Sequence, residues 1–168
     1  MKTFIESQFN YCPLVWMFHS RTVNNKINKL HERALRLVYK NFDSSFEELL
    51  NVDNSKTVHQ KNLQRLAIEL YKVKNHIAPL PMQELFIENS DHHGLRSKRF
   101  WNVPQVRTTA FGTETIRFRG PKIWENLPSN VREAETLPVF KSKIKDLRNI
   151  HCTCRLCKEF VPNLGFLQ

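Results

Sequence analysis

The sequence predicts a mainly α-helical fold, in which a helical segment is followed by a small unit of a β-hairpin and a helix and by a cysteine-containing tail. Three observations predict the helices. Glycine is scarce, with four copies in 168 residues, which is about a third of its roughly 7% average usage. Two long segments repeat apolar residues at helical spacing, and residues that can cap a helix precede the first of them. With 40% hydrophobic residues, a chain of this length can bury a sizeable core.

The first predicted segment, residues 1–88, contains the long helices. Residues 4–18 are densely apolar and indicate a helix that is disturbed near Pro13, where the proline removes a backbone donor. The next helix begins after Ser20 or Thr22, either of which can cap it. Its apolar residues recur every three or four positions and share one face. They are Val23, Ile27, Leu30, Ala34 and Leu37.

Two further helices complete this segment. Ser45, followed three residues later by Glu48, fits the capping-box pattern and predicts a short helix. A third long helix spans about residues 57–76, and Pro79 closes it. One side of that helix carries Leu63, Leu66, Leu70, Val73 and Ile77.

The second predicted segment, residues 89–168, has a different character at its start. Up to residue 122 it is poor in helix formers and rich in Thr, Phe, Val and Arg. Residues 103–110 and 115–118 therefore predict two short strands, joined as a hairpin across residues 111–114.

Helix returns after the predicted hairpin. Gly120-Pro121 ends the hairpin, and residues 122–127 predict a single helical turn. A last amphipathic helix begins near Leu137-Pro138, since proline is tolerated in a first turn. Its core residues are Phe140, Ile144 and Leu147. The cysteine tail follows this helix directly.

The charge of the chain predicts a polyanionic partner. It has 26 Lys+Arg against 16 Asp+Glu, a net charge of +10, and each phosphate neutralised by a protein releases counterions. RNA and DNA, bound with little sequence preference, are the first candidates, and an acidic membrane surface is the second. The longest uncharged stretch, residues 7–20, is too short to span a bilayer. No export signal is present, so we expect an intracellular protein, in the nucleus or the cytoplasm.

Two groups of residues are candidates for contacting nucleic acid. A row of cations on the second helix can follow a phosphate backbone without reading bases, although a solvated surface face is the alternative. This row is Lys26, Lys29, Arg33, Arg36 and Lys40. The second group combines cations with rings that can stack on single-stranded bases, unless the two rings turn into the core. It consists of Arg96, Lys98, Arg99, Phe100 and Trp101.

The tail carries the most specific chemistry, three thiols at C-x-C-x-x-C spacing. Cys152, Cys154 and Cys157 can point at one ion from a tight turn, and zinc takes four such ligands. A fourth ligand is missing nearby, because His151 directly adjoins Cys152. It would have to come from a distance, with Cys12, His92 and His93 as the candidates. Plain reduced cysteines are the alternative, and a thioredoxin-like redox motif lacks the βαβ setting that it needs.

Several motifs in order resemble one known family. They are residues 10–16 (Asn-Tyr-Cys-Pro-Leu-Val-Trp), 31–36 (His-Glu-Arg-Ala-Leu-Arg), 120–124 (Gly-Pro-Lys-Ile-Trp), 127–128 (Leu-Pro) and 152–158 (Cys-Thr-Cys-Arg-Leu-Cys-Lys). Together they resemble the region after the palm in the reverse transcriptases of jockey-like LINE (non-LTR) retrotransposons. The resemblance spans nearly the whole chain.

This resemblance implies a thumb-like helical bundle and post-thumb region that hold template and primer beside an upstream palm domain. Nucleotide transfer in that family needs paired palm aspartates, and this sequence contains no Asp-Asp pair. We therefore expect a non-catalytic fragment of an RNA-directed DNA polymerase, with Met1 marking a truncated copy or a start inside a longer reading frame. The alternative is a free-standing, zinc-stabilised adaptor that binds nucleic acid or protein.

Overall fold

A computed structural model describes residues 7–89, 99–109 and 111–157. The fold is mainly helical, which confirms the predicted class. The helices are α1 (Ser7–Phe9), α2 (Pro13–Trp16), α3 (Arg21–Tyr39), α4 (Phe46–Val52), α5 (Val58–Lys74), α6 (Leu80–Gln83), the 3-10 turn η2 (Gly112–Glu114), α7 (Ile116–Glu125), α8 (Ser129–Arg132) and α9 (Leu137–Asp146). Within the described residues, β-pairing is limited to one antiparallel bridge between Glu88 and Trp101.

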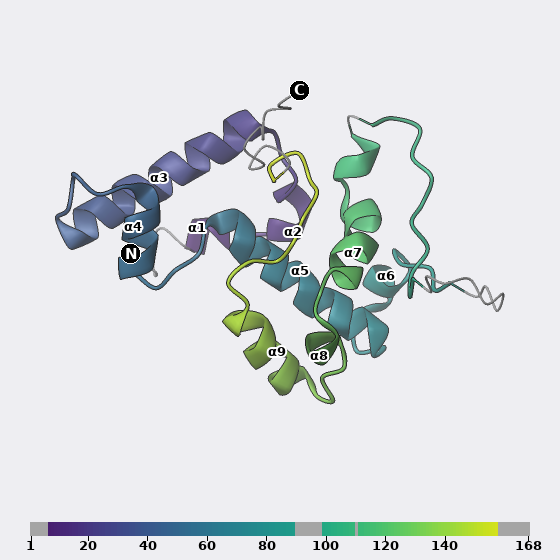
Figure 1. Cartoon of the computed structure of the whole chain (residues 1–168). Coiled ribbons are helices and arrows are strands. Elements are labelled where there is room, and N and C mark those ends of the chain that lie inside the picture. Colours follow the sequence, from purple (N-terminus) through teal and green to yellow (C-terminus); the bar gives the residue numbers. More distant parts are fainter. Residues whose placement is uncertain (1–6, 90–98, 110, 158–168) are drawn as a thin grey trace, which may run out of the picture.

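Helix α5 forms the centre of the molecule. In Figure 1 it runs diagonally through the middle, with α7 on one side and α9 on another. Thr57 caps it, since the Thr57 hydroxyl accepts a hydrogen bond from the Gln60 amide. The leucine stripe predicted from the sequence is buried, because Leu63, Leu66 and Leu70 are fully inaccessible.

Aromatic rings fill the space between α5, α7 and α9. Phe140 of α9 stacks on Tyr71 of α5 at 4.4 Å between ring centroids, and on Trp124 of α7 at 6.0 Å. Trp101 meets Trp124 edge-on at 5.5 Å. The Tyr71 hydroxyl donates to the backbone oxygen of Ala134, so its polar end is satisfied inside the core. This continuous core draws on residues from both sides of residue 89, and the division into segments 1–88 and 89–168 stays a prediction.

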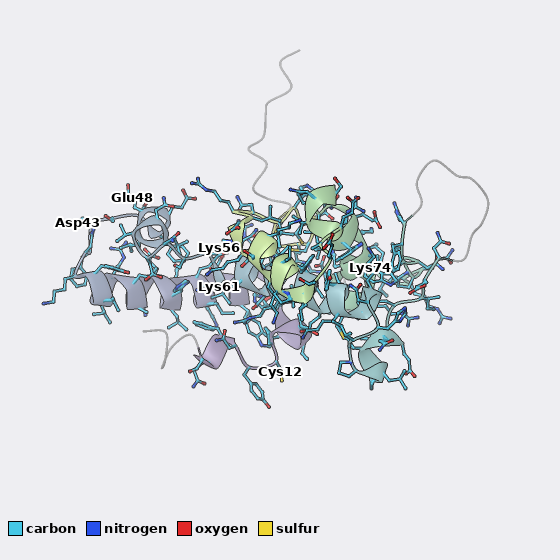
Figure 2. The ribbon with its side chains drawn as sticks, turned by 90° about the horizontal axis from the view of Figure 1, so that it is seen from below. Cys12, Asp43, Glu48, Lys56, Lys61 and Lys74 are labelled. Atoms are coloured by element: carbon cyan, nitrogen blue, oxygen red, sulfur yellow. The ribbon has the colours of Figure 1, made fainter. Side chains whose placement is uncertain are left out.

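Helices α3 and α4 form an arm beside this core. Ser20 caps α3 and Ser45 caps α4 through a complete capping box, as the sequence predicts. Leu35 of α3 packs with Leu49 and Leu50 of α4 in a small second cluster. Figures 1 and 2 both show α3 and α4 projecting to one side of the molecule, with Asp43 and Glu48 labelled near the outer end in Figure 2.

The predicted β-hairpin is wrong. Residues 115–118 begin helix α7, because the Thr115 hydroxyl accepts from the Phe118 amide and caps the helix. Residues 103–109 form no regular element. Because residues 116–118 are helical, residues 103–109 have no second strand to pair with, and the one bridge of the described residues joins Trp101 to Glu88.

The single turn predicted at residues 122–127 is also part of α7, which continues through Gly120 and Pro121. Pro121 removes one backbone hydrogen bond from the helix, and packing stabilises the helix despite this loss. A Cβ atom on Gly120 would lie 2.7 Å from Phe86 Cε1 and 3.2 Å from Leu70 Cδ2. Gly120 therefore lets α7 approach α5 closely, and Ile123 and Trp124 become buried as a result.

The last long helix, α9, begins with Leu137 and Pro138 in its first turn, as predicted. Phe140 and Ile144 of this helix are buried. None of the helices in residues 7–89, 99–109 and 111–157 is both long and apolar enough to cross a membrane.

Candidate metal centre

Four side chains converge beside the first turn of α5. His59, Cys152, Cys154 and Cys157 each offer one ligand atom, and these four atoms lie within 4.8 Å of one another. The His59 Nε2 atom is 3.4 Å from Cys154 Sγ and 3.4 Å from Cys157 Sγ. The two sulfur atoms are 3.6 Å apart, and all three cysteines are free thiols. The cluster could hold a metal ion.

These separations fit a tetrahedral ion. Zinc–sulfur bonds of about 2.3 Å and zinc–nitrogen bonds of about 2.0–2.1 Å place tetrahedral ligand sulfurs about 3.8 Å apart and a sulfur about 3.6 Å from a nitrogen. The 3.6 Å and 3.4 Å separations among His59, Cys154 and Cys157 agree with these values to within a few tenths of an ångström, and Cys152 Sγ lies within 4.8 Å of the other three ligand atoms. His59 and Cys154 are 8% and 0% exposed, so these two donors are shielded from bulk water, while Cys157 is half-buried.

Helix α5 positions the imidazole. His59 is the second residue of α5, one turn before Leu63 and on the same face. The face that buries the leucines therefore also turns His59 inward. The Phe18 ring packs edge-on against the imidazole, at 6.4 Å between centroids.

Side chains just before and within α5 hold the chain that leads to the cysteines. Lys56 Nζ donates to the backbone oxygens of Lys145 and Leu147, at 2.7 and 2.6 Å. Gln64 Nε2 donates to the oxygen of Ile144, so two polar side chains satisfy carbonyls that the end of α9 leaves open. Burial lowers the pKa of Lys56 below its usual range.

One further hydrogen bond aligns the tail with His59. Gln60 Oε1 accepts from the Ile150 amide at 3.1 Å, and Ile150 itself is 3% exposed. Gln60 follows His59 directly in α5, and Ile150 precedes Cys152 by two residues. This contact therefore sets the register in which the cysteines reach the imidazole.

An ion pair holds the metal turn, residues 152–157, from the side of α7. Arg119 Nη1 donates to the Thr153 carbonyl and hydroxyl oxygens at 2.8 and 3.1 Å, while its Nη2 atom pairs with Glu114 at 2.5 Å. The second Glu114 oxygen accepts from the Arg155 amide. A buried charge needs such partners, and here each partner also fixes the backbone between two cysteines.

The metal turn orders its own thiols. The Cys157 amide donates to the Cys154 carbonyl at 3.0 Å, and the Cys154 amide donates to Cys152 Sγ at 3.4 Å. Hydrogen bonds from Cys152 and Cys157 hold the pKa of Cys154 below its ordinary value. The neighbouring sulfur of Cys154 raises the pKa of Cys152 to about 12, and hydrogen bonding with Cys152 and Cys154 raises the pKa of Cys157.

One side of the cluster borders a cleft of about 500 Å³, which His59, Cys152 and Cys157 help to line. Its other walls come from α3, α4, the start of α5 and the tail residues Asn149, Ile150 and Leu156. This cleft is a path by which an ion or a chelator could reach the sulfurs.

The fourth candidate ligand, His59, differs from the residues predicted for that position. Cys12 is exposed, and Figure 2 shows it at the edge of the molecule by α2. His151 is exposed and contacts Asn126, while His92 and His93 lie outside the described residues. The sequence did contain a signal for His59, because the stripe of Leu63 and Leu66 extends backward onto it at helical spacing.

The predicted nucleic-acid contacts have mixed surroundings. Lys26, Lys29, Arg33 and Lys40 are exposed along α3. Arg36 is half-buried, because its guanidinium binds Glu32 at 2.8 Å and the Ser44 carbonyl oxygen at 3.0 Å.

The second predicted nucleic-acid-binding group, residues 96–101, has different surroundings before Trp101 and at Trp101 itself. Arg96 and Lys98 lie outside the described residues, and Arg99 is exposed. Phe100 is half-buried with Lys74 Nζ 5.6 Å from its ring centroid. Trp101 is 1% exposed, which is the alternative in which the ring turns into the core.

Comparison with known protein families, curated proteins and solved structures finds no significant match to this chain.

Proposed function

We propose that this chain is a zinc-stabilised helical module that binds RNA and DNA with little sequence preference. We further propose that it corresponds to the non-catalytic, C-terminal part of a jockey-like non-LTR retrotransposon reverse transcriptase. The observation that carries the proposal is the convergence of three tail cysteines on His59. It gives the cysteine motif, one of the motifs in the family resemblance, a role in attaching the tail to the helical core.

Zinc is the metal that the donor set favours. Three thiolates and one imidazole form one of the usual sets of structural zinc sites, and soft sulfur ligands disfavour magnesium, calcium and manganese. Because the protein supplies all four donors, no position is left open for a substrate. The ion would therefore stabilise the fold. An intracellular location accords with this role, since reducing compartments keep thiols free.

Charge supports the nucleic-acid partner. The net charge is +10, and α3 exposes cations along its length. Such a surface binds the phosphate backbone whatever the base sequence. Without an Asp-Asp pair, the module would hold template and primer for a palm domain and would not itself transfer nucleotides. We expect purified protein to incorporate no nucleotide on a primed template with Mg²⁺ or Mn²⁺. Incorporation above a no-protein control would contradict this part.

Two measurements test the proposal. Protein purified without chelator should contain about one zinc per chain by elemental analysis, as a single four-ligand site requires. Cys154→Ser should lose this zinc, and Cys12→Ser is the matched control that should keep it. Fluorescence anisotropy with a labelled single-stranded RNA should show binding that weakens steeply with salt. Absence of stoichiometric zinc, or absence of RNA binding at low salt, would refute the corresponding half.

One observation favours the alternative, a zinc-stabilised adaptor that docks a protein. On α3 the side chains of Val23, Leu30 and Leu37 are 43%, 53% and 70% exposed. These residues belong to the apolar face predicted from the sequence, and in a polymerase that face could pack on the palm domain. The two functions differ in salt dependence, because docking of an apolar face does not weaken as salt rises.

A further inference from the structure

A polar hollow lies on the side of the metal turn that faces α7. Its volume is about 370 Å³, which is in the range of small-ligand pockets. Three elements contribute to its walls: Glu114 from η2, Phe118, Arg119 and Lys122 from α7, and Thr153 and Arg155 from the metal turn. Both turn residues alternate with the cysteines in sequence, so metal binding would fix their positions.

The charge of these walls favours an anion. Arg119, Lys122 and Arg155 stand against the single carboxylate of Glu114, a net charge of +2. Both Glu114 oxygens already accept hydrogen bonds from the protein, one from Arg119 and one from the Arg155 amide. The carboxylate therefore holds its neighbours in place, and the residues that line the hollow keep a net positive charge.

The donors are held in position before any ligand binds. Arg119 is 5% exposed, and its Nε atom has no hydrogen-bond partner among the described residues. Lys122 Nζ lies 3.8 Å from the centroid of the Phe118 ring, a cation–π contact that restrains its long side chain. The Thr153 hydroxyl accepts from Arg119, so its own hydrogen remains to be donated. Of these donors the Arg119 Nε atom is the buried one, and a buried donor needs a partner.

We propose that this hollow binds a backbone phosphate of a nucleic-acid strand, and that the metal ion completes the site by ordering Thr153 and Arg155. The inference rests on the nucleic-acid binding proposed above and assigns it a specific place. A phosphate offers several acceptor oxygens and suits a guanidinium, an ammonium and a hydroxyl that converge. Lys122 covers one face of the Phe118 ring, so that face is not open for a base to stack on. We therefore expect the site to contact the phosphate backbone.

The test compares two variants that remove the same charge. Lys122→Gln/Arg155→Gln empties the hollow of two cations. Lys141→Gln/Lys145→Gln removes two exposed cations from α9, which do not line the hollow. Zinc content should be unchanged in both, because none of the four residues is a ligand. The readout is anisotropy of a labelled single-stranded RNA on zinc-loaded protein over a series of salt concentrations.

The hollow variant should bind about tenfold more weakly at low salt, as the loss of charge-assisted hydrogen bonds predicts. Its slope of log K against log[salt] should flatten by about 0.7 for one lost phosphate contact, while the α9 variant changes less. Equal changes in the two variants would mean that only net charge matters and would overturn the site. If the wild type itself binds no RNA, the proposed function and the site both fail. If all three proteins bind RNA with equal salt slopes, the proposed phosphate site is refuted and the proposed nucleic-acid binding stands.

The role of the metal has its own readout. Coupling between sites is reciprocal, so saturating RNA should strengthen zinc binding when zinc-loaded protein competes with a chromogenic chelator. The gain should be about tenfold in the wild type and absent in Lys122→Gln/Arg155→Gln. An equal gain in that variant, or no gain in the wild type, would show that the hollow and the metal are independent.

Discussion

His59→Ala is the sharpest test of the metal centre, because this ligand comes from a helix 95 residues away from Cys154. Loss of a residue that only orients a metal ligand typically weakens metal binding 10–100-fold. Loss of a ligand itself should therefore weaken zinc binding by at least about a hundredfold. His151→Ala is the matched control, since His151 adjoins Cys152 but lies exposed outside the cluster.

The expected effect on stability follows from mass action. At free zinc about 100 times the dissociation constant, binding stabilises the wild type by about 2–3 kcal/mol. For a domain of this size each kcal/mol shifts Tm by about 2–4 °C, so zinc should raise Tm by about 4–12 °C. The same zinc concentration only half-saturates His59→Ala and adds less than about 0.5 kcal/mol.

Thermal unfolding by circular dichroism, with and without zinc, measures this shift within each variant. The comparison is therefore independent of any packing that the alanine removes next to Phe18. His151→Ala should show the full zinc-dependent shift. A full shift in His59→Ala would refute the assignment, and the 3.4 Å approach of the imidazole to the sulfurs would then be packing alone.

Two further predictions concern α3 and α7. Lys29→Gln/Arg33→Gln should flatten the salt slope of RNA binding by up to about 1.4, at about 0.7 per phosphate contact on a single strand. Adding Arg36→Gln should change the slope little, because Arg36 is engaged by Glu32; unchanged slopes throughout would leave the row as a solvated face. Gly120→Ala should destabilise the fold by about 1–3 kcal/mol, since its Cβ would overpack the core. Urea unfolding that shows no loss would contradict the close approach of α7.

Local signals in the sequence predicted the helices whose ends they define. Ser20 and Ser45 both cap the helices that follow them, and Pro138 lies in the first turn of α9. Each of these contacts spans only a few residues, so its cause lies within the local sequence. The mainly helical class followed from the same signals.

Where the predictions from local sequence were wrong, contacts between residues far apart in the chain determine the structure. Gly120-Pro121 has the local character of a chain break, yet the helix continues because Gly120 fits against Phe86 and Leu70. On α3, periodicity identified an apolar face but not the neighbour that would cover it. The residues that α3 buries are His31, Ala34 and Leu35. Only Ala34 belongs to the predicted apolar face; His31 and Leu35 each follow a residue of that face directly in the sequence. Leu35 packs against α4.

In the candidate site, too, local spacing predicted some of the residues and non-local packing supplied the other. Spacing alone identified Cys152, Cys154 and Cys157, because a short turn can bring three thiols together. His59 is a non-local partner, and hydrogen bonds of Gln64 with α9 and of Gln60 with the Ile150 amide accompany its approach to the cysteines. No spacing rule connects residues so far apart, although the leucine stripe of α5 had placed His59 on the buried face.

This arrangement sets a limit on how far zinc can stabilise the fold. The three cysteines lie within six residues, so an unfolded chain can still bring them together around an ion. Binding to the unfolded chain reduces the stabilisation that zinc gives, and the folded state gains only what His59 adds. If His59 contributes a hundredfold in affinity, stabilisation should level off near about 2.7 kcal/mol as zinc increases. Tm plotted against the logarithm of free zinc should therefore rise and then reach a plateau. A continued rise of about 1.4 kcal/mol per decade of zinc would show instead that the unfolded tail does not hold the ion.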